Sequence, residues 1–319
     1  LWPNEIGPVP TNAIPDFYGM YVPDGFLVPL HSTGAVYLVP LPQGGTKIKI
    51  TADKTGYFYH RVVWHDMNGD GRLDALTARG HLPLLLRGQP TSSKGVGELL
   101  WLEQPQSGAL SGQPWKEHVL AQGPDFFFAV VSQEGGKLVV AANEFFGERV
   151  VLFTVDTSSG ELLSQRVVDS DIGPGDDIQV ADLDGDGVQD LLVTSHVGHQ
   201  GGGVYAYAGP TFAARYTLAH NFTVVLPGIN QASPGLAYAV PGTPPGEPCP
   251  IVVAGDGAAA AYYLKPLGKN FPFQYQTVEF LRVGGTVGAL GLRQGSPLLF
   301  VPWYEEGVVY PFLLQQQDN

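Results

Sequence analysis

Two acidic loops constrain the fold of this 319-residue chain more than any other feature of its sequence. The first loop, DMNGDGRLD, spans residues 66–74, and the second, DLDGDGVQD, spans residues 182–190. Each places oxygen-bearing side chains at positions 1, 3, 5 and 9 and glycine at positions where the backbone must turn tightly. Apolar, β-rich runs flank both loops, at residues 61–64 and 191–194. Each loop is therefore expected to join two strands.

The spacing of the acidic side chains predicts a calcium site in each loop. Calcium takes about six to eight oxygen ligands, and a calcium loop supplies them from alternate residues. An EF-hand is excluded because it requires Glu at position 12 and a helix on each side. The alternative is a pair of acidic hairpin turns that bind no ion. The expected ligands, with backbone carbonyls at position 7, are Asp66, Asn68, Asp70, Arg72 and Asp74 in the first loop and Asp182, Asp184, Asp186, Val188 and Asp190 in the second.

This strand–loop–strand pattern resembles the FG-GAP or VCBS repeats of integrin-α-type β-propellers, in which a calcium loop links the first two strands of a blade. The resemblance implies a propeller fold with two structural calcium ions and no organic cofactor. It does not imply one activity, because related propellers serve as adhesion modules, lectins, lyases and small-molecule enzymes.

Repeated apolar runs support the propeller interpretation. With 42 glycines, 27 prolines and 15% charged residues, the composition favours many short strands joined by tight turns. We predict an all-β fold, a single six-bladed β-propeller with four-stranded antiparallel blades, in one domain that covers residues 1–319. No fourth strand is evident in the last blade after Leu314, so we expect the N-terminal segment, residues 2–9, to close the ring. The inner strands are expected at residues 17–21, 61–65, 127–131, 178–182, 235–240 and 286–290.

Charge and cysteine content restrict the partners and the compartment. A net charge of −13 argues against a nucleic-acid partner, whose phosphates require a basic surface. No stretch approaches the roughly 20 apolar residues of a membrane span. Cys249 is the only cysteine, which favours a reducing compartment. The calcium loops and the Asn221-Phe222-Thr223 glycosylation motif instead point to secretion or the secretory pathway, which we expect.

Histidines and aromatic residues concentrate in the loops expected on the face opposite the calcium loops. Apolar surface with a few convergent polar groups is typical of small-ligand sites. The alternatives are that the histidines are solvated loop residues, that Asp177 caps a strand, or that His196 and His199 bind a transition metal. We predict a catalytic acid–base set of His60, His196, His199 and Asp177. The predicted substrate-binding residues are Tyr59, Phe126, Phe146, Trp303, Tyr304, His31 and His81.

The first functional hypothesis is an enzyme that acts on a small, largely apolar substrate. One instance is loss of water from a hydroxylated aromatic compound to give a quinone methide, followed by hetero-Diels–Alder cyclisation. In overall type the chain is similar to fungal hetero-Diels–Alderases of tropolone–sesquiterpenoid biosynthesis, a resemblance that implies a cofactor-independent cyclase or lyase of secondary metabolism. The second hypothesis is a calcium-supported lectin or adhesion module with a glycan partner. The third is a carbohydrate lyase or dehydratase, in which Arg79 would hold the substrate carboxylate.

Overall fold

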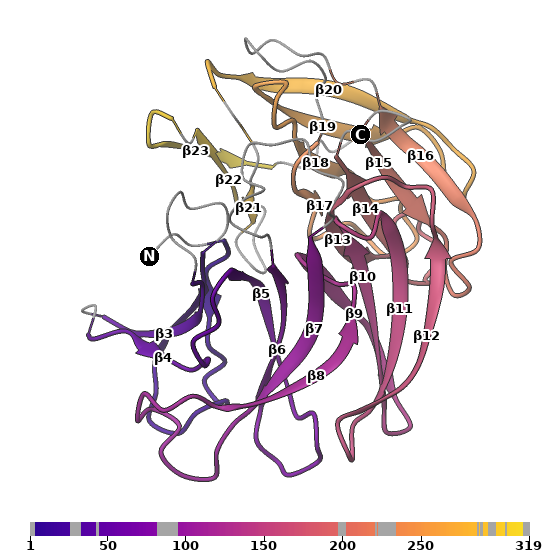
Figure 1. Cartoon of the computed structure of the whole chain (residues 1–319). Helices are drawn as coiled ribbons and strands as arrows, with labels where there is room; N and C mark the ends of the chain where they lie inside the picture. The colour runs from indigo at the N-terminus through magenta and orange to yellow at the C-terminus, as the bar shows by residue number, and fades with distance from the viewer. Residues whose placement is uncertain are drawn as a thin grey trace. The chain divides into compact units, whose positions relative to one another are not determined.

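The structure is a computed structural model, and the chain forms strands and connecting loops with no helix among its described residues (Figure 1). No described segment is therefore a helix that could cross a membrane. The described residues are 4–25, 33–42, 45–81, 95–196, 202–220, 222, 234–285, 287, 290–292, 298–303 and 305–314.

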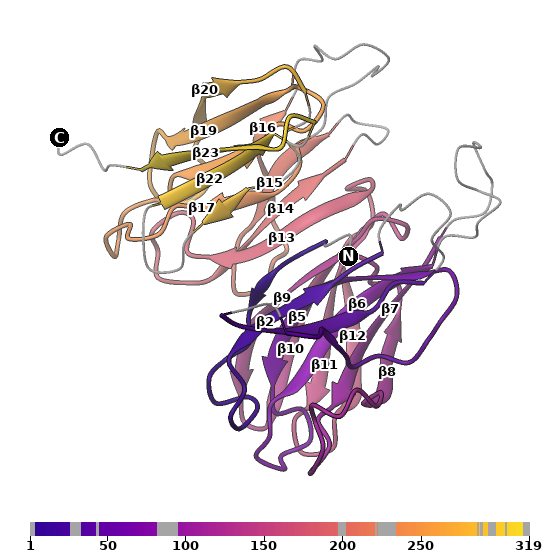
Figure 2. The same ribbon diagram turned by 90° about the vertical axis from the view of Figure 1, so that its left-hand side faces the viewer.

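The chain divides into two compact units. The first unit comprises residues 1–147 and 151–166, and the second comprises residues 148–150 and 167–319. Six antiparallel sheets, the blades, carry the fold, and within each sheet the strands are neighbours in chain order (Figure 2).

Three four-stranded blades lie wholly or mainly in the first unit. Their strands are β1 (Gly7–Pro8), β2 (Gly19–Pro23), β3 (Val36–Pro40) and β4 (Ile48–Lys49); β5 (Tyr57–His65), β6 (Asp74–His81), β7 (Val96–Glu103) and β8 (Lys116–Gln122); and β9 (Phe127–Glu134), β10 (Lys137–Glu144), β11 (Arg149–Asp156) and β12 (Glu161–Asp169).

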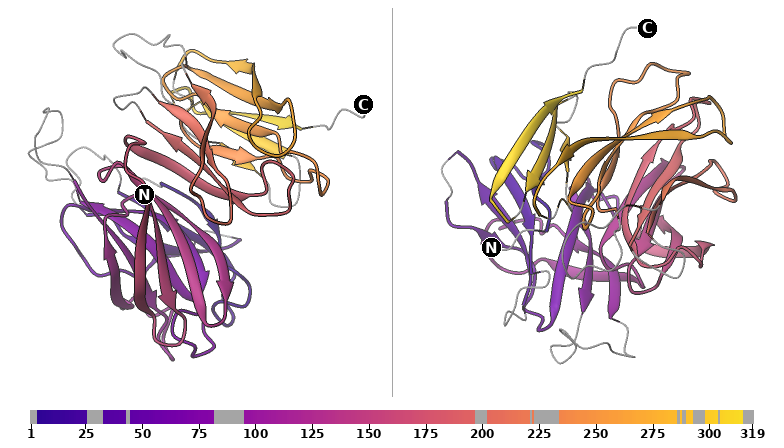
Figure 3. Two further views of the ribbon diagram at one scale, coloured as in Figure 1. Left: turned by 90° about the vertical axis from the view of Figure 1, so that its right-hand side faces the viewer. Right: turned by 90° about the horizontal axis from the view of Figure 1, so that it is seen from above.

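The second unit holds two four-stranded blades and a last sheet with three described strands. These strands run from pink through orange to yellow in both views of Figure 3. They are β13 (Gly175–Ala181), β14 (Asp190–Ser195), β15 (Gly203–Tyr207) and β16 (Arg215–His220); β17 (Ala237–Ala239), β18 (Ile251–Ala254), β19 (Ala260–Pro266) and β20 (Tyr275–Arg282); and β21 (Gly291–Leu292), β22 (Leu298–Trp303) and β23 (Val308–Leu313).

Burial along the strands explains why these sequences form blades. The second strand β14, DLLVTS, is buried at every residue, as expected for a continuous apolar run covered on both faces. The outer strand β12, ELLSQRVVD, has no buried residue and carries polar side chains along most of its length. The six-bladed all-β prediction is confirmed, and the expected inner strands of the second, third and fourth blades match β5, β9 and β13.

The predicted closure by the N-terminal segment is wrong, as is the first inner strand. Gly7 pairs with Tyr21 and Pro8 with Met20, so β1 is the inner strand of the first blade and β2 its second strand. β1 pairs along the inner edge of β2. Glu5, just before β1, accepts hydrogen bonds from Tyr21 and Arg61 at 2.8 and 3.0 Å. Of the last inner strand, expected at residues 286–290, residues 286, 288 and 289 lie outside the described residues, and the first described strand of the last sheet is β21.

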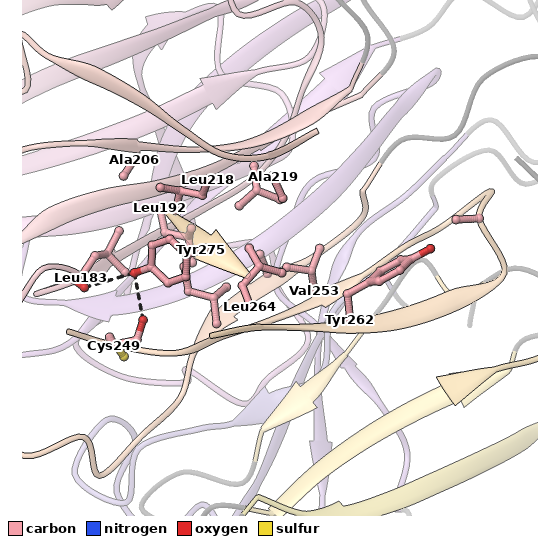
Figure 4. Close-up of a cluster of buried hydrophobic side chains, with 14 of the residues drawn as sticks. Leu183, Leu192, Ala206, Leu218, Ala219, Cys249, Val253, Tyr262, Leu264 and Tyr275 are labelled. Atoms are coloured by element: carbon pink, nitrogen blue, oxygen red, sulfur yellow. Dashed lines mark hydrogen bonds between the residues drawn. The ribbon is translucent and has the colours of Figure 1, made fainter. Parts of the chain in front are cut away.

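The hydrophobic cores lie between successive blades of the same unit. Figure 4 shows the core between the fourth and fifth blades, where Leu192 of β14 and Leu264 of β19 are almost completely buried. The buried Tyr275 donates its hydroxyl proton to the carbonyl oxygens of Leu183 and Cys249, at 3.2 and 3.0 Å. Its ring therefore fills apolar space while its polar tip is satisfied.

A fully buried arginine holds the second blade together. Arg79 of β6 donates to Glu98 of β7 at 2.6 Å and to Glu117 of β8 at 2.8 Å. It also donates to the Tyr59 hydroxyl of β5 at 3.1 Å. One guanidinium thus links all four strands of this blade, and it is already engaged by protein carboxylates. This arrangement gives no support to Arg79 as the group that holds a substrate carboxylate.

Replacing Arg79 with Met is expected to destabilise the fold by about 3–5 kcal/mol, because two poorly solvated carboxylates lose their cation. The free energy of unfolding from urea titration measures this effect. Lys116→Met is the matched control, since Lys116 pairs with Glu103 while 70% of its side chain is exposed. The control should lose less than about 1 kcal/mol. Equal losses in the two variants would contradict the stabilising role of Arg79.

Candidate functional site

Both acidic loops lie where the sequence predicted them, between the first two strands of a blade. Residues 66–73 join β5 to β6, and residues 182–189 join β13 to β14. The Asp66 carboxylate accepts hydrogen bonds from the backbone N–H groups of Gly69 and Gly71, at 2.7 and 2.9 Å. Asp182 does the same for Gly185 and Gly187, at 2.9 and 3.0 Å.

The loop glycines adopt a backbone conformation that other residues rarely reach. Gly69 and Gly71 have φ angles of 75° and 86°, and Gly185 and Gly187 have φ angles of 79° and 86°. A side chain at any of these positions would be strained. The two loops therefore have glycines in the left-handed conformation at the same two positions, the fourth and the sixth.

The ninth residue of each loop is a buried carboxylate. Asp74 accepts from the N–H groups of Met67 and Gln104, at 3.0 and 2.8 Å. Asp190 accepts from Leu183 and Gly209, both at 2.9 Å. Burial raises the pKa of Asp74 and of Asp190 to about 6, against the lowering effect of these hydrogen bonds. A nearby cation would offset this loss of hydration.

The second loop presents the more complete donor set. Carboxylate oxygens of Asp182, Asp184 and Asp190 lie within 4.8 Å of one another. In the first loop, Asn68 replaces the second carboxylate, and Arg72 forms an ion pair with Asp70. Oxygen-only donors of this kind fit a hard cation such as calcium.

The predicted catalytic residue His60 lies inside an aromatic cluster of the first unit. Its ring centroid is 4.8 Å from that of Phe126 and 5.2 Å from that of Phe127. Burial, with a smaller effect of Arg61, lowers the pKa of His60 to about 3. The imidazole is therefore neutral at physiological pH and only 6% exposed, which does not suit proton exchange with a substrate.

The carboxylate of Asp177, another predicted catalytic residue, is already engaged in hydrogen bonds within the protein. Its carboxylate accepts from the N–H groups of Ile178 and Ala237, at 2.8 and 3.2 Å, and from the Gln179 amide. Its own N–H donates to Thr194 at 2.9 Å. Asp177 therefore ties β13 to β14 and to β17 of the next blade, which agrees with the alternative that it is a structural residue.

His196 is the predicted acid–base residue that the structure places among carboxylates. It directly follows β14, and its Nε2 lies 3.6 Å from Oδ2 of Asp256. The Asp256 carboxylate, and to a smaller degree Asp176, raise the pKa of His196 against the effect of burial. The His196 side chain is 40% exposed, so a substrate can reach it.

The two carboxylates beside His196 are absent from the predicted site. Burial raises the pKa of Asp176 to about 7, with Asp177 and Asp256 adding to the rise and His196 opposing it. Asp256 holds a left-handed backbone conformation, with φ of 40°, and its N–H donates to Val287 at 2.7 Å. In the sequence, the available signal was that Asp176 precedes the inner strand expected at residues 178–182 and that Asp256 follows an expected second strand.

Two of the aromatic residues predicted to line a substrate site, Tyr59 and Phe126, are buried among different neighbours. Tyr59 is fully buried beside Arg79, and burial raises its pKa to about 12. Phe126 packs against Phe145 and Phe146, with ring centroids 5.0 and 5.6 Å away.

Three of the remaining predicted residues lie outside the described part of the chain. Trp303 ends β22 and is partly buried, and His81 ends β6 with its ring against Tyr57. His31, His199 and Tyr304 are the predicted site residues outside the described ranges.

Comparison with solved structures defines the class of protein. The chain is similar to hydrazine synthase of Kuenenia stuttgartiensis (14% identity, 93% of this chain and 80% of that chain, TM-score 0.52). It is also similar to an α-L-arabinanase of Penicillium chrysogenum complexed with arabinobiose (13% identity, 94% of this chain and 88% of that chain, TM-score 0.53). A third similar structure is an α-L-arabinofuranosidase of Fusarium graminearum with an iminosugar inhibitor (11% identity, 94% of this chain and 87% of that chain, TM-score 0.54).

These similarities establish the fold, and the class is that of the six-bladed β-propellers. No family model and no curated protein sequence matches the chain. Neither the FG-GAP or VCBS family nor the Diels–Alderase family therefore receives support from a family model.

The pKa of His196 is expected to fall in the Asp256→Asn variant, because the attracting carboxylate is lost while burial remains. Histidine Cε1–H chemical shifts followed against pH by NMR measure it, and His60 serves as an internal reference that stays neutral at pH 5. Because folding raises the pKa of His196, its pairing stabilises the fold below pH about 6.5 and loses this effect as the pH rises through the folded pKa. An unchanged His196 titration in Asp256→Asn would contradict the pairing.

Proposed function

We propose that this propeller is an enzyme whose acid–base centre is His196 with Asp256 and Asp176. One observation carries the proposal: an accessible imidazole lies beside the carboxylates of Asp256 and Asp176. Burial raises the pKa of Asp176 to about 7, and the Asp256 carboxylate raises the pKa of His196. Residues that transfer protons work best when their pKa lies near the operating pH. Backbone strain at Asp256 is a further feature that functional sites often share.

The reaction class that suits this centre is loss of water from a hydroxylated aromatic compound. The imidazolium of His196, held by Asp256, donates its proton to the leaving hydroxyl group as the C–O bond breaks. The carboxylate of Asp176 takes the phenolic proton, and the electrons of that O–H bond form the carbonyl of a quinone methide. A proton then returns from Asp176 to His196, so the net change is one molecule of water lost.

We propose a small, largely apolar aromatic substrate for this reaction, and cyclisation of the quinone methide with an alkene as the following step. Trp303, a partly buried aromatic side chain at the end of β22 in the same unit as His196, supports an apolar substrate. Holding two reactants in the correct geometry can contribute roughly 7–11 kcal/mol to lowering the barrier.

The His196→Gln variant is expected to lose about 10²–10⁴-fold of the dehydration rate, because the proton donor is gone. The assay incubates ortho-hydroxybenzyl alcohols with a thiol trap and measures the quinone methide adduct by mass spectrometry. His118→Gln is the matched control, since His118 lies on the outer strand β8 and its ring pairs with the Glu103 carboxylate of β7. The same rate in His196→Gln and the wild type would contradict the role of His196, and no adduct in the wild type would contradict the reaction.

Calcium in the two acidic loops is the second part of the proposal. The oxygen donors, the left-handed glycines and the buried ninth carboxylates support one structural ion in each loop. Such an ion would neutralise the acidic side chains and hold the two strands of each hairpin in register. Extracellular calcium modules bind with dissociation constants of about 10⁻⁴–10⁻³ M, which suits the proposed location in the secretory pathway.

Calcium is expected to raise the melting temperature, because an ion bound only by the folded state stabilises it by about 2.7 kcal/mol at a hundredfold excess over the dissociation constant. Differential scanning calorimetry in calcium, magnesium and EGTA measures the effect. Asp182→Ala should remove one of two ions counted by calorimetric titration, and Asp171→Ala is an acidic control outside the loops. Equal melting temperatures in calcium and EGTA would contradict the proposal.

A glycan ligand is the second candidate function. Two of the similar structures are named as arabinan- or arabinose-active proteins, one of them with arabinobiose bound. Binding or cleavage of arabino-oligosaccharides, with no turnover of hydroxybenzyl alcohols, would favour a lectin or a carbohydrate-active enzyme over the dehydrating enzyme.

A further inference from the structure

A pocket of about 410 Å³ lies in the first unit beside the first acidic loop. Its volume is in the range of small-molecule sites, about 300–1,000 Å³. Apolar groups of Ile14, Pro15 and Leu110 form part of the wall, and Arg72 and Gln104 contribute polar groups. None of the proposed catalytic residues lines this pocket, so it is a site separate from His196.

Arg72 is the one charged side chain among the residues that line the pocket. Its Nε donates to the Gln104 carbonyl at 3.2 Å, and its Nη2 pairs with the Asp70 carboxylate. The described residues provide no hydrogen-bond partner for its Nη1. The guanidinium is therefore oriented by the protein, and part of its donor capacity remains for a ligand.

We infer that this pocket binds a small organic carboxylate, with Arg72 on the carboxylate and the apolar wall on the rest of the molecule. Guanidinium groups bind carboxylates with two parallel hydrogen bonds. A single arginine beside Ile14, Pro15 and Leu110 suits a monoanion with an apolar body better than a highly charged phosphate. Asp70 competes with such a ligand, because its carboxylate occupies the same guanidinium.

A cation in the first loop strengthens this binding. Asp70 is the fifth residue of the loop and an expected cation ligand, so an ion that takes its carboxylate releases Arg72 to the pocket. This step rests on the proposed calcium binding. Since coupling between two sites is reciprocal, the carboxylate ligand must strengthen calcium binding by the same factor. The second loop has Val188 in place of Arg72 and forms no such pair, so only the first ion is coupled.

Benzoate is the probe, and benzamide is its neutral isostere. Trp115 is the reporter, because its indole N–H donates to the carbonyl of Ala109, a pocket residue, at 3.1 Å. Benzoate should change tryptophan fluorescence and bind about tenfold more tightly in calcium than in EGTA, and benzamide should not bind. Isothermal titration of calcium with and without benzoate should show one of two ions bound more tightly.

Three variants separate the pocket from the calcium proposal. Arg72→Met should abolish benzoate binding, and Arg282→Met is the matched control, since Arg282 pairs with Glu279 three residues earlier on β20. Asp70→Asn should bind benzoate tightly in EGTA, because Arg72 has lost its competitor. If the wild type binds no calcium, the proposed calcium site fails, and Asp70→Asn still tests the pocket. Benzoate binding that is equal to benzamide binding, that survives Arg72→Met or that is absent in Asp70→Asn would overturn the inference.

Discussion

Turns between antiparallel strands leave backbone N–H groups without a strand partner, and buried aspartates satisfy these groups throughout this protein. Asp74 and Asp190 each accept two such bonds after an acidic loop. Asp125 accepts two from Phe145 and Phe146. Asp177 reaches across to Ala237 in the next blade. Loops that connect the first two blade strands, and contacts between neighbouring blades, therefore depend on the same interaction.

The interaction has an electrostatic consequence that connects the fold to its sites. A carboxylate that leaves water loses hydration, so its pKa rises unless a positive group compensates. Burial raises the pKa of Asp125 to about 7 and that of Asp74 and Asp190 to about 6. In the acidic loops a bound cation would supply the compensation. The imidazole of His196 opposes the burial of Asp176 only in part, so the pKa of Asp176 stays near 7, and proton exchange is proposed there.

The acidic loops were predictable because the residues that define each loop are consecutive in the sequence. Nine consecutive residues contain both the oxygen side chains and the glycines, and the backbone path follows from their order. The long apolar strands, such as β14, were visible for a similar reason, since a run of buried residues stands out in the sequence. Two-residue strands such as β1 and β21 carry no periodicity, and only their pairing with β2 and β22 reveals them.

The candidate site was predictable only in part. Sequence position placed His60, Asp177 and His196 in comparable loops, yet His60 is enclosed by phenylalanines and Asp177 is bound to backbone groups. Adjacent residues point in different directions along a strand, so the choice between Asp176 and Asp177 depends on how β13 packs. Asp256 comes from another blade, 60 residues from His196 in the chain, and no local pattern connects them.

The sequence by itself determined the fold class, the number of blades and the two acidic loops, because hydrophobic runs and loop spacing act over a few residues. The tertiary structure decided how the first blade is built, which ionisable groups are buried and which carboxylates meet His196. Burial and long-range pairing set these properties, and both depend on residues far apart in the chain.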